Sequence, residues 1–378
     1  MLFRSVPLYL VLGNHEGEQG WLLNGTADNT AVRAANARKL YYPNPVPDAF
    51  YTGNSREEPL VGLRGNYYAW EWGAALFVVL DPYWYTLKKP GKTVDNWAWT
   101  LGRDQYDWFR KTLENSTAAF KFVFCHQLVG GGDNEGRGGI EDAGYYEWGG
   151  NNADGTWGFD DHRPGWEKPI HQLMVENGVT VFFHGHDHFY ARQELDGVIY
   201  QLVPQPGHPN FSTVDYAAEY GYEKGDIVPN SGHLLVTVRK NDARIDYIRS
   251  YLASNETATR KNGDVSRTYT VSAGLVTGQA EETGLPRGFS LEQNTPNPFN
   301  HMTTIQYSLA AAGGVRLNVY DSLGRIVKNI LNEYQPAGHY SVSWDGRDAR
   351  GRTAGSGMYV YSLVAGSRFE TRRMIMMK

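Results

Sequence analysis

Residues 179–188 read Val-Thr-Val-Phe-Phe-His-Gly-His-Asp-His, and this stretch decides the fold. An apolar run of strand length leads directly into a histidine group in which His186 and His188 lie two positions apart. In layered α/β folds, functional side chains are displayed where strands end. The stretch therefore predicts a buried strand that presents histidines at the edge of a sheet.

Two other segments repeat this arrangement. Val6–Leu12 is an apolar run, predicted to be a buried strand, that leads into Gly13-Asn14-His15-Glu16, and His126 follows the apolar run Lys121–Cys125. Amide oxygens and neutral imidazoles suit Zn, Fe or Mn ions. Two such ions about 3.5–4 Å apart stabilise the attacking and leaving oxygens of a phosphoryl transfer. The ordered set therefore predicts a two-metal site for phosphoester hydrolysis.

Around these motifs, strands alternate with helical patterns in the manner of a layered α/β core. Apolar runs predict strands at Tyr67–Trp72, Leu76–Leu80, Ala119–Cys125 and Val179–His184. Apolar spacing and end signals predict helices at Asn29–Leu40, Arg103–Leu113 and Trp166–Glu176. After His188, we expect the second sheet of a sandwich, with strands at Tyr190–Leu195, Val198–Val203, Leu234–Arg239, Ala243–Arg249 and Ser266–Val271.

The sequence pattern and the charge of the chain change after residue 272. Residues 273–288 lack periodicity and read as a linker between a catalytic domain at 1–272 and a small β-module at 289–378. Short alternating strands are expected in the module at Ile305–Leu309, Val315–Tyr320, Tyr340–Trp344 and Met358–Val364. Residues 286–378 carry a net charge of +5, whereas the remainder carries −10.

Composition excludes several classes of protein. A net charge of −5 and a pI near 6.1 give no basic surface of the kind that nucleic-acid binders need. The single cysteine, Cys125, excludes an internal disulfide framework and a cysteine-rich zinc site. No apolar run reaches the roughly 20 residues of a membrane-spanning helix, so no membrane span is expected.

Gly13–Glu16, His126 and Gly185–His188 together resemble the calcineurin-like metallophosphoesterase superfamily, which includes the purple acid phosphatases. The resemblance covers roughly residues 5–272. It implies an α/β (α+β) four-layer metallophosphoesterase sandwich, with two β-sheets flanked by helices, followed here by a small all-β immunoglobulin-like sandwich.

The resemblance also implies roles for individual residues. Asn14, His126 and His186 would bind one metal ion, and His188 would bind the other. His15 would lie beside the phosphate and assist the leaving group while a metal-bridging water attacks phosphorus. The two ions would be divalent or trivalent Fe, Zn or Mn, and the sequence leaves their identity open.

One part of the family pattern is missing. The Asp-x-His and Gly-Asp motifs that precede Gly-Asn-His in the family are absent from this sequence. We therefore expect a truncated chain that binds metal poorly and has low activity, with a signal peptide in the missing region.

The C-terminal part resembles the sorting domain of the type IX secretion system. The matching residues are Asn294–Asn300, Val319–Arg325, Trp344–Arg347, Gly357–Tyr359 and the basic end Arg372–Lys378. The resemblance implies a protein that is secreted or attached to the cell surface, with the secretion machinery as a partner. A carbohydrate-binding or adhesion sandwich is the alternative for this module.

The sequence thus predicts a secreted, metal-dependent phosphoesterase that acts on phosphate mono- or diesters. The alternative from another class is a surface-displayed binding protein built on a degenerate phosphoesterase scaffold. A phosphatase acting on phosphoserine or phosphothreonine is a third possibility, which export makes less attractive. Oligomeric state and substrate are left open by the sequence.

Overall fold

The structure is a computed structural model that describes residues 7–377, apart from 90, 92–94, 132–135, 208–210, 274–288, 301, 310–312, 323, 336–337 and 366–367. The chain divides into two compact units, Met1–Thr277 and Gly278–Lys378. The predicted linker at 273–288 lies outside the described residues except for Ala273.

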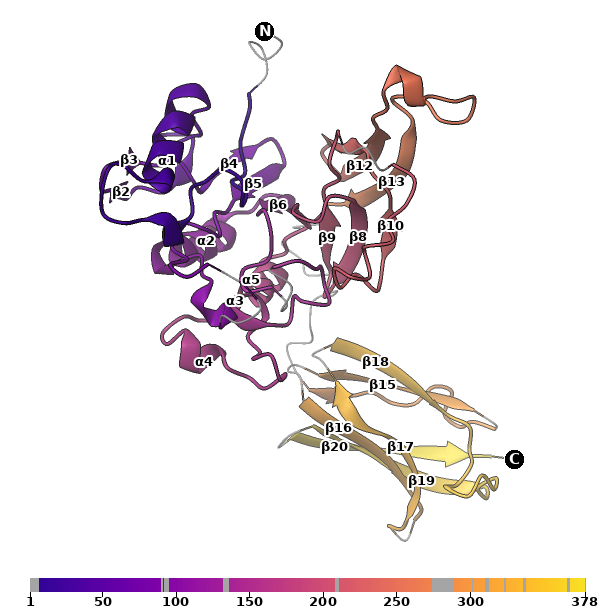
Figure 1. Cartoon of the computed structure of the whole chain (residues 1–378). Helices are drawn as coiled ribbons and strands as arrows, with labels where there is room; N and C mark the ends of the chain where they lie inside the picture. Colours follow the sequence, from indigo (N-terminus) through magenta and orange to yellow (C-terminus); the bar gives the residue numbers. More distant parts are fainter. Residues whose placement is uncertain are drawn as a thin grey trace. The chain divides into compact units, whose positions relative to one another are not determined.

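An eight-stranded mixed sheet organises the first unit (Figure 1). Its spatial order is β1-β4-β5-β6-β7-β9-β8-β10. Strands β5, β6, β7 and β9 are parallel, and the remaining neighbours pair antiparallel. The strands span Thr52–Gly53 (β1), Tyr68–Trp72 (β4), Ala75–Val79 (β5), Phe120–Phe124 (β6), Val181–His184 (β7), Tyr190–Leu195 (β8), Val198–Leu202 (β9) and Asp226–Val228 (β10).

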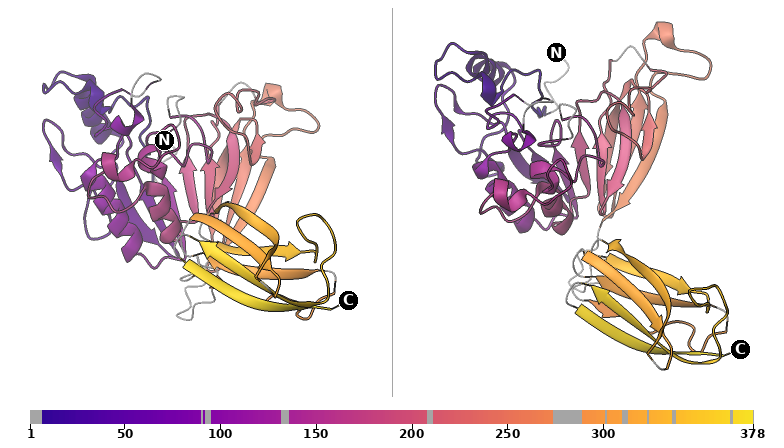
Figure 2. Two further views of the ribbon diagram at one scale, coloured as in Figure 1. Left: turned by 90° about the horizontal axis from the view of Figure 1, so that it is seen from below. Right: turned by 60° about the horizontal axis from the view of Figure 1, so that its bottom comes forward.

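Helices cover one face of this sheet (Figures 1 and 2). The helices that pack on it are Arg103–Asn115 (α2), Tyr146–Gly149 (α3) and Ile170–Glu176 (α5), whereas Thr30–Tyr41 (α1) and Phe159–His162 (α4) belong to separate apolar clusters. Helix α2 buries Tyr106, Phe109 and Leu113 in the same apolar cluster as the sheet residues Val78 and Val123. Helix α1 begins where the Asn29 side chain accepts a hydrogen bond from the Val32 amide, at 3.0 Å.

A three-stranded antiparallel sheet packs on the opposite face (Figure 2). It consists of β11 (Gly232–Val238), β12 (Asp242–Arg249) and β13 (Val265–Ser272). Leu234 and Val236 of β11 join the buried Phe122 and Phe183 in the core between the two sheets. The short elements of this unit are β2 (Glu57–Glu58), β3 (Gly62–Leu63) and the 3₁₀-helices Gly20–Leu22, Asn96–Ala98 and Ala253–Asn255.

The second unit consists of strands alone among its described residues. One sheet contains β14 (Ser290–Leu291), β15 (Thr303–Leu309) and β18 (Gly338–Trp344), and the other contains β16 (Gly313–Tyr320), β17 (Ile326–Gln335), β19 (Gly357–Ala365) and β20 (Arg368–Met376). Both sheets contribute to one apolar core that includes Trp344 and Tyr361. The expected all-β sandwich is therefore confirmed.

The expected α/β arrangement of two packed β-sheets is also confirmed, with three corrections. The hairpin β8–β9 joins the eight-stranded sheet, whereas we expected it in the second sheet. The predicted strand Val6–Leu12 is wrong: residues 7–13 form no strand, and Leu8 is 47% exposed. The Asn44 side chain, rather than a neighbouring strand, hydrogen-bonds the backbone N–H and C=O of Leu10, both at 3.0 Å.

A helical layer over the three-stranded sheet is not found among the described residues. Among all the residues that the structure describes, no helix is long and apolar enough to cross a bilayer.

Candidate metal centre

Strands β6 and β7 bring two of the histidine segments together. The strands are parallel neighbours, with Phe124 opposite Phe183. The pairing continues past the strand ends, where the Gly185 amide donates a hydrogen bond to the carbonyl oxygen of His126 at 2.8 Å. Because parallel strands end at the same edge, His126 and the residues after Gly185 lie next to one another.

The third segment meets them through Asn14. Its side-chain Oδ1 lies 2.9 Å from His126 Nε2. The loop is held locally, because Glu16 accepts a hydrogen bond from the Gly13 amide at 2.5 Å and Gln19 donates one to the Asn14 carbonyl. Glu16 therefore supports the loop.

His186 and His188 adopt an unusual backbone. Their φ angles are +76° and +61°, in the left-handed region that residues with a Cβ rarely occupy. Asp187, which is 2% exposed, lies between them and anchors the turn. Surrounding contacts must hold both strained residues in place. The contacts of Asp187, which lies between them, therefore help to fix the positions of the two imidazoles.

Three donors converge on the Asp187 carboxylate. They are Arg137 Nη1 at 2.7 Å, the Tyr222 hydroxyl at 2.8 Å and the Gly138 amide at 3.1 Å. Burial raises the pKa of Asp187, although all three donors act in the opposite direction. The Arg137 guanidinium also stacks on the Tyr220 ring, 4.1 Å from its centroid. We call Asp187 and its three donors the Asp187 clamp.

The clamped turn places His186 beside His126. The two ring centroids are 5.3 Å apart, and the rings are nearly perpendicular. His186 Nε2 is buried and has no hydrogen-bond partner among the described residues. A buried imidazole nitrogen without a hydrogen-bond partner is costly to the folded state unless a ligand such as a metal ion binds it.

Burial also keeps these imidazoles neutral. Chiefly because of burial, and secondarily because of neighbouring His188 and His15, the pKa of His126 is lowered to about 4. Burial likewise lowers the pKa of His186 to about 3, with His126 and Arg137 as further causes. At neutral pH both rings carry a free lone pair, which is the form that binds metal.

These side chains fit one metal ion. Two ligands at right angles, each about 2.1 Å from an ion, lie about 3 Å apart, which matches the separation of Asn14 Oδ1 and His126 Nε2. His186 Nε2 supplies a third, unpaired donor atom. No group of three or more His, Cys, Asp and Glu side chains in the described residues could hold an ion by itself, so the Asn14 amide is needed to complete this set.

The remaining two predicted site residues lie at the margin. His188 and His15 are both exposed, and each acts electrostatically on His126 and His186. The structure therefore groups all five predicted side chains, with Asn14, His126 and His186 inside and the other two at the surface.

A second supporting network, which sequence reasoning missed, approaches His126 from the other side. Asp81, which is fully buried, accepts hydrogen bonds from Arg64 at 3.1 Å and from the Tyr83 amide at 2.9 Å. The Tyr83 hydroxyl in turn donates to Gln127, the residue after His126. An aspartate directly after an apolar strand was the available signal for this network.

Comparisons with known proteins agree with this architecture. Residues 1–190 match the family described as calcineurin-like phosphoesterase, and residues 300–368 match the FlgD Ig-like domain. No curated protein sequence matches the chain.

Three solved structures are similar to parts of the chain. PhoD is 14% identical, with 69% of this chain and 52% of PhoD covered and a TM-score of 0.43. The purple acid phosphatase PPD1 from yellow lupin (Lupinus luteus) seeds is 14% identical, with 68% and 39% covered and a TM-score of 0.37. PorZ, described as an essential surface component of the type-IX secretion system of Porphyromonas gingivalis, is 15% identical, with 48% and 26% covered and a TM-score of 0.19.

The chain thus spans about half of PhoD and a smaller share of PPD1 and PorZ. The match over residues 1–190 extends across half of the chain and includes every predicted metal-binding residue. The chain belongs to the calcineurin-like phosphoesterase family.

Proposed function

We propose that this protein is a metal-dependent phosphoesterase that hydrolyses phosphate mono- or diesters. The observation that carries the proposal is the contact of Asn14 Oδ1 with His126 Nε2 at 2.9 Å, beside the His186 ring, whose Nε2 has no partner among the described residues. Two of these groups are imidazoles that burial keeps neutral, and the third is an amide oxygen, so together they offer a metal ion three uncharged donors.

Each residue then has a defined role. Asn14, His126 and His186 would hold one ion, and the exposed His188 would hold a second. When bound, the metal pair would supply an activated water and would neutralise charge on the phosphoryl group. His15, at the surface beside these ligands, would protonate the leaving oxygen or stabilise its developing charge. The Asp187 clamp would position His186 and His188 without touching substrate.

The ligand set for the second ion is small. A catalytic zinc ion takes about three protein ligands and a water, whereas His188 alone is assigned to the second ion here. We therefore propose that this polypeptide by itself binds the metal pair weakly and has low activity, with iron, zinc and manganese all compatible with its donors.

Hydrolysis of p-nitrophenyl phosphate and bis-p-nitrophenyl phosphate tests the proposal. The chain would be stripped with chelator and reloaded with Mn²⁺, Zn²⁺ or Fe²⁺ separately. We expect metal-dependent release of nitrophenol that His126→Ala abolishes, and His15→Gln should lower kcat by roughly 10²–10⁴-fold with little change in KM.

His162→Gln is the matched control, because this histidine stacks on Trp97 outside the candidate centre. Equal residual turnover in His126→Ala and His162→Gln would refute the proposed site. Metal binding to the chain without turnover of either ester would instead favour a binding protein on a phosphoesterase scaffold.

We further propose that residues 289–378 direct export through the type IX secretion system and leave the protein secreted or attached to the cell surface. The proposal is supported by the sequence resemblance of this segment and by its separate apolar core. Fusion of these residues behind a periplasmic signal and a fluorescent protein, expressed in a bacterium with that system, should place fluorescence outside the cell. Retention in the periplasm would contradict a sorting role.

A further inference from the structure

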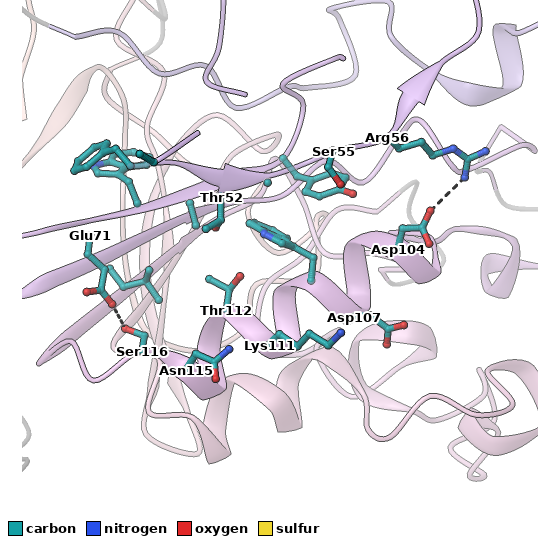
Figure 3. A pocket seen from close by; sticks show the side chains of 18 residues that line it. Thr52, Ser55, Arg56, Glu71, Asp104, Asp107, Lys111, Thr112, Asn115 and Ser116 are labelled. Carbon is teal, nitrogen blue, oxygen red and sulfur yellow. Dashed lines mark hydrogen bonds and ion pairs between the residues drawn. The ribbon is translucent and has the colours of Figure 1, made fainter. Parts of the chain in front are cut away.

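A cavity of about 850 Å³ lies apart from the histidine cluster, in the first unit of the chain. It runs between helix α2 and the β1–β4 edge of the eight-stranded sheet (Figure 3). None of the predicted metal-site residues lines it. Its volume falls within the range of about 300–1,000 Å³ that is typical of small-molecule sites.

One face of α2 forms a wall of this cavity. The lining residues from the helix repeat at intervals of three and four, so they share a face: Asp104, Asp107, Trp108, Lys111, Thr112 and Asn115. Tyr106, Phe109 and Leu113 occupy the opposite, buried face. In Figure 3 the labelled helix residues face Thr52 and Ser55 across the cavity. The helix therefore uses one side for the core and leaves the other free for a ligand.

An aromatic pair provides an apolar surface in the cavity. The rings of Trp108 and Tyr67 are 4.9 Å apart, and Tyr67 is 3% exposed while Trp108 is partly exposed. Trp108 Nε1 is buried and has no hydrogen-bond partner among the described residues. Because this nitrogen has no accessible surface, the part of Trp108 that a ligand can contact is its partly exposed ring, against which apolar C–H groups can pack.

Hydrogen-bonding side chains surround this aromatic pair. Lys111, Thr112 and Asn115 make no side-chain hydrogen bond or ion pair within the described part of the chain. Together they offer an ammonium, a hydroxyl and an amide. Side chains of both donor and acceptor character suit a ligand with many hydroxyl groups, each of which both donates and accepts.

The ends of the cavity are closed by polar pairs. Arg56 bonds Asp104 at 3.3 Å, and the Ser116 hydroxyl donates to Glu71 at 2.5 Å (Figure 3). With Asp107 and Lys111 included, the lining has three carboxylates against two cations. Arg103, outside the lining, pairs with Asp107 at 2.6 Å, so the charges around the cavity balance and a neutral ligand is favoured over an anionic one.

We propose that this cavity binds a neutral saccharide, whose C–H face packs on the Trp108 ring and whose hydroxyl groups bond to Lys111, Thr112 and Asn115. The site is separate from the metal centre and does not depend on the proposed phosphoesterase activity. It gives the first unit of the chain a second ligand of a different chemical class.

Isothermal titration calorimetry of the full chain with cellohexaose, maltohexaose, xylohexaose and mannohexaose tests the proposal. At least one of these saccharides should bind with a dissociation constant of about 1 mM or tighter. Trp108→Leu removes the aromatic ring against which the sugar would pack, and should weaken binding about three- to tenfold. Because Trp108 is partly buried, the exposed double variant Lys111→Ala/Asn115→Ala provides a second test and should weaken binding at least as much.

Two matched controls keep the comparison within the same elements. Glu114→Ala changes an exposed residue of α2 outside the cavity, and Trp72→Ala removes a tryptophan of β4 that is 66% exposed and does not line it. Both should bind the saccharide as the unmodified chain does. The proposal is overturned if no saccharide of the panel binds, if neither cavity variant weakens binding, or if anionic oligogalacturonate or a peptide competes more strongly than the neutral sugars.

Discussion

Replacing Asp187 by asparagine changes the size of the side chain very little, but it should destabilise the first unit strongly. The carboxylate is 2% exposed and accepts three hydrogen bonds, from Arg137, Tyr222 and Gly138. An asparagine keeps one oxygen, but its NH₂ group must turn toward a donor. At least one buried donor is then left without an acceptor, which costs about 1–3 kcal/mol.

The loss of charge adds to this cost. Arg137 loses its carboxylate partner, and its side chain is 24% exposed, so water screens part of the effect. We therefore expect Asp187→Asn to lower the free energy of unfolding by about 2–4 kcal/mol. Urea unfolding of the chelator-treated chain, followed by fluorescence and circular dichroism, measures this difference without any contribution from metal.

Asp226→Asn is the matched control. Asp226 bonds Arg267 at 2.7 Å, but the two side chains are 39% and 42% exposed, so the loss should stay below about 1 kcal/mol. If Asp187→Asn cost no more than this control, the clamp would not be what holds the His186–His188 turn. A second readout is Zn²⁺ affinity, which we expect to fall about 10–100-fold in Asp187→Asn and to stay unchanged in the control.

Three further predictions concern other parts of the site and its support. Gly13→Ala should reduce metal affinity and activity without unfolding the chain, because a Cβ there would lie 2.8 Å from the His126 ring; Gly25→Ala, with open space around it, controls for the effect of the added methyl. His184→Leu should flatten the loss of stability on acidification. Burial lowers the folded-state pKa of His184 to about 3, so the unfolded chain binds the proton first and stability falls as the pH drops below about 6.5. Chelator-treated wild type should lose roughly 1.4 kcal/mol per pH unit more than His184→Leu between about pH 6 and 4, measured by denaturant titration. Arg64→Met should cost about 3–5 kcal/mol in the same assay, because Arg64 is fully buried and bonds the buried Glu18 at 2.6 Å; equal stability would show that the ionic network is dispensable.

Much of the fold follows from local pattern. The apolar runs that form β5, β6 and β7 each contribute to apolar clusters on both faces of the sheet, so their sequences are almost continuously hydrophobic. Asn29 is a good helix cap and does begin α1. Val6–Leu12 is an exception. Its apolar pattern matches a strand, but the backbone of Leu10 hydrogen-bonds to the Asn44 side chain and not to a neighbouring strand.

The candidate site was predictable in composition but not in its support. Three motifs predicted to follow strands named the candidate ligands, and two of them, at His126 and at Gly185–His188, do follow the parallel strands β6 and β7, which end at one edge. The Asp187 clamp could not be found this way. Its donors Arg137 and Tyr222 are 50 and 35 residues distant in sequence, and neither belongs to a recognisable motif. Their role arises only when the fold brings them to one carboxylate.

The clamp also bears on the choice between enzyme and binding protein. A turn with His186 and His188 both at positive φ is unfavourable for each residue, and a glycine or a polar residue with less strain could replace either if the turn had only to connect β7 to β8. The chain instead retains both imidazoles and surrounds the intervening carboxylate with three donors. It also keeps His186 Nε2 buried without a partner, which is a further cost to the folded state. A surface that bound another molecule through its exposed residues would gain nothing from a buried, unpaired nitrogen. A metal ion that needs this nitrogen offsets both costs, so the local energetics favour a metal-binding centre over a surface that binds a partner only through exposed residues.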